Sequence, residues 1–131
     1  MPCKILLVED DPDFRAVLAM ALELQGFMVR QAAGGHKALE ALSIERPDLI
    51  ISDLEMNGID GRALCKHARA DTAFADIPIV VLSAFVDPDR SQNLDDLPAD
   101  CLLSKQVPLS QLVDLIRGLL DGPRRRAQTL G

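Results

Sequence analysis

The stretch IISDLEMNG, Ile50 to Gly58, is an apolar run that ends on a carboxylate and is followed by a turn-forming Asn-Gly pair. The run does not alternate between apolar and polar residues, so it predicts a strand buried on both faces, as in a parallel sheet. Asp53 therefore stands at the end of a buried strand. A carboxylate is unusual at the end of a buried strand. The residues that end the other apolar runs indicate which role it has.

Short aliphatic runs alternate along the chain with longer segments whose apolar residues repeat at helical spacing. This alternation is typical of an α/β domain with a doubly wound, five-stranded parallel sheet. A helix over Asp87–Leu97 would be marginal, because Pro88 and Asn93 disfavour it and few apolar residues anchor it. Strands are expected over Lys4–Val8, Met28–Ala32, Asp48–Ser52, Ile77–Leu82 and Cys101–Leu103, and further helices over Asp13–Gln25, Lys37–Glu45, Arg62–Ala70 and Leu109–Leu120.

Polar residues stand at the ends of four of these predicted strands. In an open parallel sheet such ends lie along the edge where ligands bind, so we expect the side chains to converge on one crevice. Two like charges about 4 Å apart repel by about 4 kcal/mol at an effective dielectric constant of about 20, so a cation should share the site. Oxygen ligands beside phosphate chemistry favour Mg²⁺. The residues are Glu9, Asp10 and Asp11, then Asp53, Ser83, Ser104 and Lys105.

Each of these residues has a simpler explanation when it is taken alone. Asp11 or Asp13 suits the cap of the following helix, because an acid there accepts hydrogen bonds from backbone N–H groups. Ser83 could simply end a strand, and Lys105 could be a surface charge. Together, however, an acid pair, a lone acid, a hydroxyl and a lysine, each after its own strand, indicate a functional site. The two histidines are given no role.

Length, charge and cysteine content narrow the choice of function further. The chain has 131 residues, 48% of them hydrophobic, which suits one globular domain. Its net charge of −6 argues against direct binding to nucleic acid. It has no apolar stretch of about 20 residues that would insert into a membrane. Cys3, Cys65 and Cys101 lack metal-ligand spacing and are expected to be reduced thiols of a cytoplasmic protein.

Four motifs together resemble the receiver domain of two-component response regulators. They are ILLVEDDPDFR (5–15), LIISDLEMNGIDG (49–61), IPIVVLSA (77–84) and ADCLLSK (99–105). The resemblance covers the chain from Lys4 to about Leu120. It implies a flavodoxin-like fold with strand order 2-1-3-4-5 and a phosphorylation-dependent signalling switch. Such a domain is not an enzyme, except that it catalyses its own phosphoryl transfer and the hydrolysis of its aspartyl phosphate.

The resemblance also implies a role for each site residue. Asp53 would accept a phosphoryl group from a histidine kinase or a histidine phosphotransfer protein, since a carboxylate can attack phosphorus to form a mixed anhydride. Ser83 would bond a phosphoryl oxygen, and Lys105 would pair with the phosphoryl group. The Mg²⁺ ligands would be Asp10, Glu9 directly or through water, Asp53 and the backbone carbonyl of Glu55.

The resemblance divides the chain into two parts. Residues 1–121 would form the receiver domain, and residues 122–131, which contain three consecutive arginines, would be a flexible basic tail or linker stub. No effector domain is recognisable, so the chain would be either a stand-alone receiver or the N-terminal part of a longer protein. Its downstream partner would be another protein.

Four positions depart from the usual pattern of the family, one of them Pro98, which replaces a glycine. Asn57 and Gln106 replace prolines, so the first turn should be less rigid, and the peptide before Gln106 should be either trans or strained. Leu102 replaces the aromatic residue that rotates on activation. Phosphorylation is therefore expected to be read from Phe85 and the Asp87–Leu97 segment more than from the surface around Leu102.

Two other functions fit part of the pattern. A small haloacid-dehalogenase-like phosphatase also arranges a strand-end Asp, a Ser or Thr and a Lys around Mg²⁺. Its second acid pair follows the lysine, however, whereas Glu9 and Asp10 precede Asp53. The other alternative is a receiver-like module that binds proteins without being phosphorylated. The residues that argue against it are Asp10, Asp53, Ser83 and Lys105.

Overall fold

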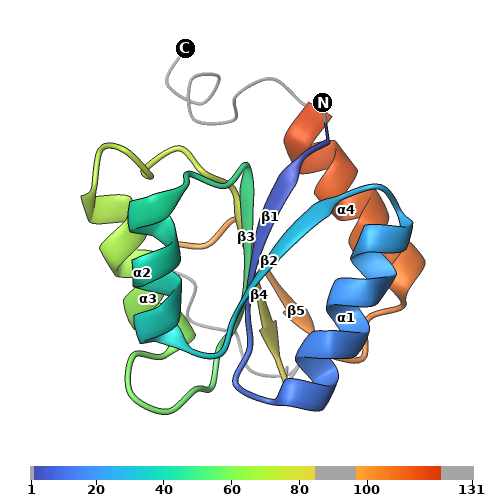
Figure 1. The fold of residues 1–131 in the computed structure, drawn as a ribbon, viewed down its shortest axis with the longest axis horizontal. Helices are drawn as coiled ribbons and strands as arrows, with labels where there is room; N and C mark the ends of the chain where they lie inside the picture. Colours follow the sequence, from blue (N-terminus) through green and yellow to red (C-terminus); the bar gives the residue numbers. More distant parts are fainter. Residues whose placement is uncertain (1, 85–96, 122–131) are drawn as a thin grey trace.

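The computed structural model describes residues 2–84 and 97–121. Five strands form one parallel sheet in the order β2-β1-β3-β4-β5 (Figure 1), as expected for a flavodoxin-like α/β fold. The strands are β1 (Lys4–Val8), β2 (Met28–Ala32), β3 (Leu49–Asp53), β4 (Ile79–Ser83) and β5 (Cys101–Ser104). The described helices are α1 (Pro12–Leu24), α2 (Gly35–Ile44), α3 (Gly61–Ala70) and α4 (Leu109–Asp121).

Helices cover both faces of the sheet. In Figure 1, α1 and α4 lie on one face and α2 and α3 on the other. Ile5 and Leu7 of β1 pack into the apolar cluster under α1 and α4. Leu6 and Val8 pack into the cluster under α2 and α3, because successive side chains of a strand point to opposite faces. A strand between two apolar layers must be apolar throughout, which explains the unbroken runs in the sequence.

The chain order of the strands reverses at the centre of the sheet. The chain moves outward from β1 to β2 on one side, and then from β3 to β4 and β5 on the other. Every residue of β3 and β4 is buried, so these two strands are held rigidly between the helical layers. The carboxyl ends of β1 and β3 therefore flank a crevice at the switch point, where open α/β sheets bind their ligands.

The bounds of β1 and β2 are as predicted, and those of β3, β4 and β5 differ from the predicted ones by one or two residues. β4 begins at Ile79 and not at Ile77, because Pro78 has no N–H to donate to the ladder. β3 begins and ends one residue later than expected, so Asp53 is the last residue of the strand and lies opposite Leu82 of β4. Ser83 was expected just after the fourth strand and is likewise the last residue of β4.

The start of α1 confirms the structural role given to Asp11. The Asp11 carboxylate accepts hydrogen bonds from the backbone N–H groups of Asp13, at 3.0 Å, and of Phe14, at 3.4 Å. Pro12 occupies the first helical turn, where its missing N–H has no intrahelical partner to lose. Asp11 is thus engaged with the helix as its N-cap, and both Asp10 and Asp11 are exposed.

Arg69 joins α3 to the amino ends of β4 and β5. Its guanidinium donates to the carbonyls of Pro98 and Ile77, at 3.0 and 2.7 Å, and pairs with Asp100 at 3.0 Å. The same Asp100 carboxylate oxygen accepts from the N–H of Ile79 at 2.8 Å. Both charged side chains are largely buried, so this bonding fixes the edge of the sheet opposite the crevice.

Several sequence expectations concern other parts of the fold. Phe85, most of the proposed 87–97 helix and the 122–131 tail lie outside the described residues, although Leu97 is buried in the core as expected. No peptide bond among the described residues is cis, so the bond before Gln106 is trans.

Burial raises the pKa of the Cys65 thiol to about 12, as suits a structural cysteine. None of the described helices is both long and apolar enough to cross a membrane.

Candidate functional site

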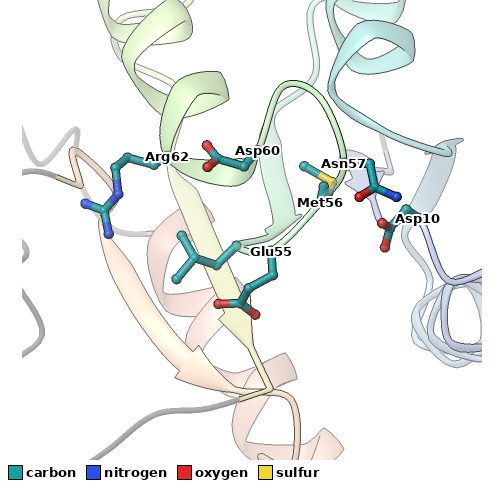
Figure 2. Close-up of a pocket in the computed structure, with 7 residues that line it drawn as sticks. Asp10, Glu55, Met56, Asn57, Asp60 and Arg62 are labelled. Carbon is teal, nitrogen blue, oxygen red and sulfur yellow. The ribbon is translucent and has the colours of Figure 1, made fainter.

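A pocket of about 470 Å³ opens between Asp10, two residues after β1, and the loop that follows β3 (Figure 2). The turn in this loop uses Gly58, whose φ of 76° lies in the left-handed region that glycine adopts without strain. The pocket therefore forms at the switch point of the sheet. Its lining residues are Asp10, Leu54, Glu55, Met56, Asn57, Asp60 and Arg62.

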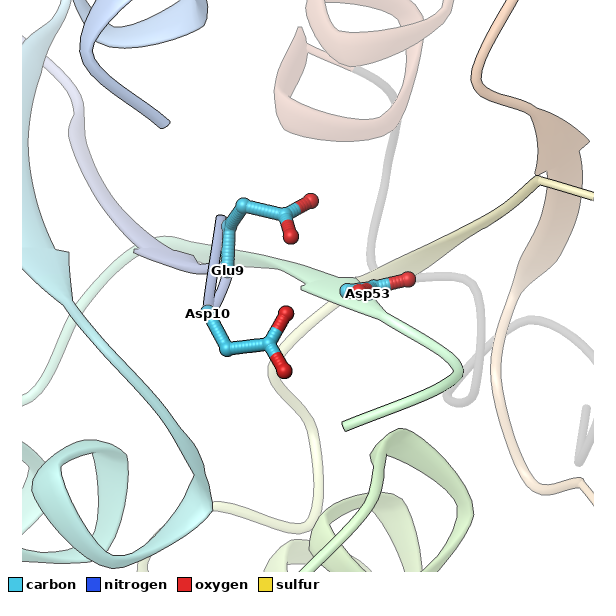
Figure 3. A group of neighbouring side chains, drawn as sticks. All are labelled: Glu9, Asp10 and Asp53. Atoms are coloured by element: carbon cyan, nitrogen blue, oxygen red, sulfur yellow. The ribbon is translucent and has the colours of Figure 1, made fainter. Parts of the chain in front are cut away.

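Three carboxylates meet beside this pocket. Glu9 and Asp10 follow β1 and Asp53 ends β3, and one oxygen from each lies within 4.8 Å of the others (Figure 3). Glu9 and Asp53 are almost completely buried, with 1% and 3% of their surface exposed, whereas Asp10 is exposed. The structure thus brings together the three acids that the sequence places at the ends of two strands. An all-oxygen donor set of this kind suits Mg²⁺.

Lys105 lies between the two buried acids. Its ammonium nitrogen is 2.9 Å from Glu9 Oε1 and 3.2 Å from Asp53 Oδ2. It also lies 5.0 Å from the centre of the Phe14 ring, close enough for a cation–π contact. The backbone N–H of Lys105 donates to the Ser83 carbonyl at 2.9 Å, which holds the lysine beside the end of β4. Part of the positive charge that the acids require is therefore supplied by the chain itself.

The ionisation of Glu9 and Lys105 reflects opposing effects. Burial raises the pKa of the Glu9 carboxyl, and the hydrogen bonds from Lys105 and from the Asp11 N–H only partly offset this. Burial lowers the pKa of Lys105, but its bonds to Glu9 and Asp53 outweigh burial and leave that pKa raised. Lys105 therefore remains charged throughout the physiological range.

Backbone groups hold the other oxygens of the buried acids. Glu9 Oε2 accepts from the N–H of Asp11 at 3.0 Å, and Asp53 Oδ1 accepts from the N–H of Glu55 at 3.3 Å. Arg15, which sequence reasoning missed, donates to the carbonyl of Glu9 at 2.8 Å. The side chains are thus oriented before any ligand arrives, and this lowers the cost of arranging them later.

Ser83 lies at the site and bonds a side chain that the sequence did not suggest. Its hydroxyl donates to Glu55 Oε2 at 2.8 Å, and the N–H of Ala84 donates to Glu55 Oε1 at 3.4 Å. Sequence reasoning gave Glu55 a role through its backbone carbonyl alone. The side-chain bond spans 28 positions of the chain and depends on the β3–β4 register, which no local pattern reveals.

Gly61 keeps the loop after β3 close to the strand. Its N–H donates to the Leu54 carbonyl at 3.0 Å. A β-carbon at position 61 would collide with the Asp53 carbonyl oxygen and approach the Leu54 Cα to 2.9 Å. The first residue of α3 therefore packs directly against the end of β3, which fixes the position of the Asp53 backbone.

Comparison with known proteins identifies the family to which the chain is similar. Residues 5–117 match the family model described as the response regulator receiver domain. The DNA-binding dual master transcriptional regulator RpaA of Synechocystis is 35% identical over 119 residues, which are 89% of this chain and 48% of RpaA. Response regulator MprA of Mycolicibacterium vanbaalenii is 34% identical over 120 residues, 92% of this chain and 51% of MprA. The chain thus spans about half the length of these curated relatives.

Solved structures of similar fold agree with this match. The chemotaxis response regulator CheY4 of Vibrio cholerae superposes with a TM-score of 0.83 at 28% identity, over 92% of this chain and all of CheY4. The response regulator TrrA of Thermotoga maritima, solved in complex with Mg²⁺ and BeF, gives a TM-score of 0.80 at 29% identity, over 92% of this chain and all of TrrA. The family model, the curated relatives and the solved structures therefore agree on the family.

The position of Lys105 predicts how its removal affects stability. Lys105→Met should lower the free energy of unfolding by about 2 kcal/mol, because it leaves two buried carboxylates without their counter-charge. Screening by solvent reduces the cost of these unpaired charges. Urea unfolding followed by far-UV circular dichroism, with a chelator present, measures this. Lys37→Met is the matched control, since Lys37 only pairs with Glu40 at 3.7 Å on the surface. Equal, small losses in both variants would contradict a bridging role for Lys105.

Proposed function

The chain belongs to the response regulator receiver domain family, and we propose that Asp53 is the phosphoacceptor of this chain. Members of the family are phosphorylation-dependent signalling switches. The observation that carries the proposal is the pairing of a nearly buried strand-end carboxylate with Lys105 at 3.2 Å. A buried acid that is held by a lysine at the switch point of a sheet is placed to react with a ligand in the crevice.

The proposed reaction needs little from the protein beyond positioning and charge stabilisation. A carboxylate oxygen of Asp53 attacks phosphorus, and the bond between phosphorus and the donor histidine nitrogen breaks as the new bond forms. The leaving imidazole takes up a proton. Lys105 stays beside Asp53 to offset the charge of the acyl phosphate, and the Ser83 hydroxyl would bond one of its oxygens.

The acidic cluster fits Mg²⁺ as the partner of this reaction. We propose that Mg²⁺ is held by Glu9, Asp10 and Asp53 together with the backbone carbonyl of Glu55. Three carboxylates with mutually close oxygens support this, since Mg²⁺ binds one or two carboxylates and retains water molecules, and Glu9 would bind it either directly or through one of these waters. When bound, Mg²⁺ would supply positive charge to the phosphoryl oxygens. Lys105 already neutralises the inner side of the cluster, so the exposed Asp10 would face the ion.

Receiver domains are signalling domains and not enzymes in the usual sense. Response regulators of this family receive their phosphoryl group from histidine kinases, and we infer a histidine kinase or a histidine phosphotransfer protein as the donor here. The only catalysis proposed is that of the domain's own phosphorylation and dephosphorylation.

We further propose that the protein is cytoplasmic, that it signals to another protein and that it does not itself contact nucleic acid. Residues 1–121 would be the receiver domain, with 122–131 as tail or linker.

The role of Asp53 predicts a specific loss of labelling. With Mg²⁺ and acetyl phosphate, the protein should gain one phosphoryl group, and Asp53→Asn should gain none because an amide is a far weaker nucleophile than a carboxylate. Intact-mass spectrometry measures both. Asp114→Asn, which makes the same change at an exposed site on α4, should be labelled like the unsubstituted protein. Persistent labelling of Asp53→Asn would remove Asp53 from this role.

The different settings of Asp10 and Asp11 predict different losses. Asp10→Ala should weaken Mg²⁺ binding at least about tenfold, the scale seen even for groups that only support a metal ligand. Asp11→Ala should instead lower the free energy of unfolding by about 1 kcal/mol, because it removes a helix cap, and should change Mg²⁺ affinity little. A Mg²⁺ titration followed by amide chemical shifts, together with urea unfolding, separates the two effects. Equal losses of affinity would show that the acids are wrongly assigned.

A further inference from the structure

The side chain of Glu55 is exposed, yet both of its oxygens have partners at the end of β4. Oε2 accepts from the buried Ser83 hydroxyl at 2.8 Å, and Oε1 accepts from the Ala84 N–H at 3.4 Å. In Figure 2 the Glu55 carboxylate lies beside the end of that strand and away from Asp10. The backbone N–H of the same residue donates to Asp53 Oδ1 at 3.3 Å. Glu55 thus joins the reactive carboxylate to the neighbouring strand.

The first of these bonds occupies the hydroxyl on which the proposed phosphoryl group would depend. A serine hydroxyl carries one proton and can donate it to one acceptor at a time. While Ser83 donates to Glu55, it is not available to a phosphoryl oxygen on Asp53. The Ala84 N–H, one residue further on, is engaged by the same carboxylate. Glu55 therefore holds the Ser83 hydroxyl, which the proposed phosphoryl group would also need, and bonds the residue next to it.

We propose that Glu55 is a positioning residue that acts through Ser83 and opposes phosphorylation of Asp53. Modification of Asp53 draws Ser83 away, so the Ser83–Glu55 bond must break before the modified state is fully stabilised. The free energy of that bond is then subtracted from the affinity of the site for a phosphoryl group. The released Glu55 carboxylate would leave β4, so the loop after β3 would respond to phosphorylation together with β4. This inference rests on the proposed function of Asp53.

Charge alone would also make Glu55 unfavourable to an anion, and a double-mutant cycle separates the two effects. The probe is beryllofluoride with Mg²⁺, and its binding is followed by ¹⁹F nuclear magnetic resonance. Glu55→Ala should tighten binding about tenfold, the scale of a hydrogen bond to a charged group. In a Ser83→Ala background the same substitution should tighten binding by about threefold or less, because the charge effect alone remains. Glu40→Ala, which removes an exposed acid from α2, is the matched control and should change nothing.

The outcomes distinguish this inference from the proposed function. Tightening that depends on Ser83 supports the positioning role of Glu55. Equal tightening in both backgrounds, or none in either, overturns that role while leaving Asp53 as the phosphoacceptor. If beryllofluoride fails to bind even the unsubstituted protein, both the proposed function and this inference fall.

Discussion

The site depends on a lysine that holds two buried carboxylates together. Glu9 and Asp53 would repel each other strongly in the low-dielectric interior, and the Lys105 ammonium within 3.2 Å of both offsets that repulsion. Because both acids are nearly inaccessible to water, the lysine is integral to the folded state and not only a group that waits for substrate. The same charge that stabilises the fold stands beside the carboxylate proposed to react.

The fold supplies the rigidity that this arrangement needs. β1 and β3 deliver their acids from between two apolar layers, so neither strand can shift without disrupting a core. Arg69 and Asp100 fasten the opposite edge of the sheet, and Gly61 lets α3 pack directly against the end of β3. The exposed parts are Asp10 and the loop that carries Glu55, where a metal ion and a phosphoryl group would enter. Fixed charges thus meet an exposed loop at one edge of the sheet.

The sequence predicts the fold and the meeting of these polar side chains at the switch point, because both follow from short-range patterns. The apolar run before Asp53 identifies a buried strand, and the parallel topology then brings the acids, Ser83 and Lys105 to one edge. Strand bounds were less accurate where Pro78 interrupts the ladder. Contacts between distant side chains could not be predicted. The Glu55–Ser83 bond and the Arg69–Asp100 pair span 28 and 31 positions, and each depends on how separate elements pack.

A crystal structure of the protein with Mg²⁺ and beryllofluoride tests the central claim most directly. We expect beryllium to be bonded to Asp53, and Lys105 to remain paired with the modified side chain. Mg²⁺ should lie on the side of Asp10. The Ser83 hydroxyl should donate to a fluorine and no longer to Glu55. Beryllofluoride on another carboxylate, or Lys105 withdrawn from the modified Asp53, would contradict the view that this lysine-bridged acid pair is the phosphoryl-accepting centre.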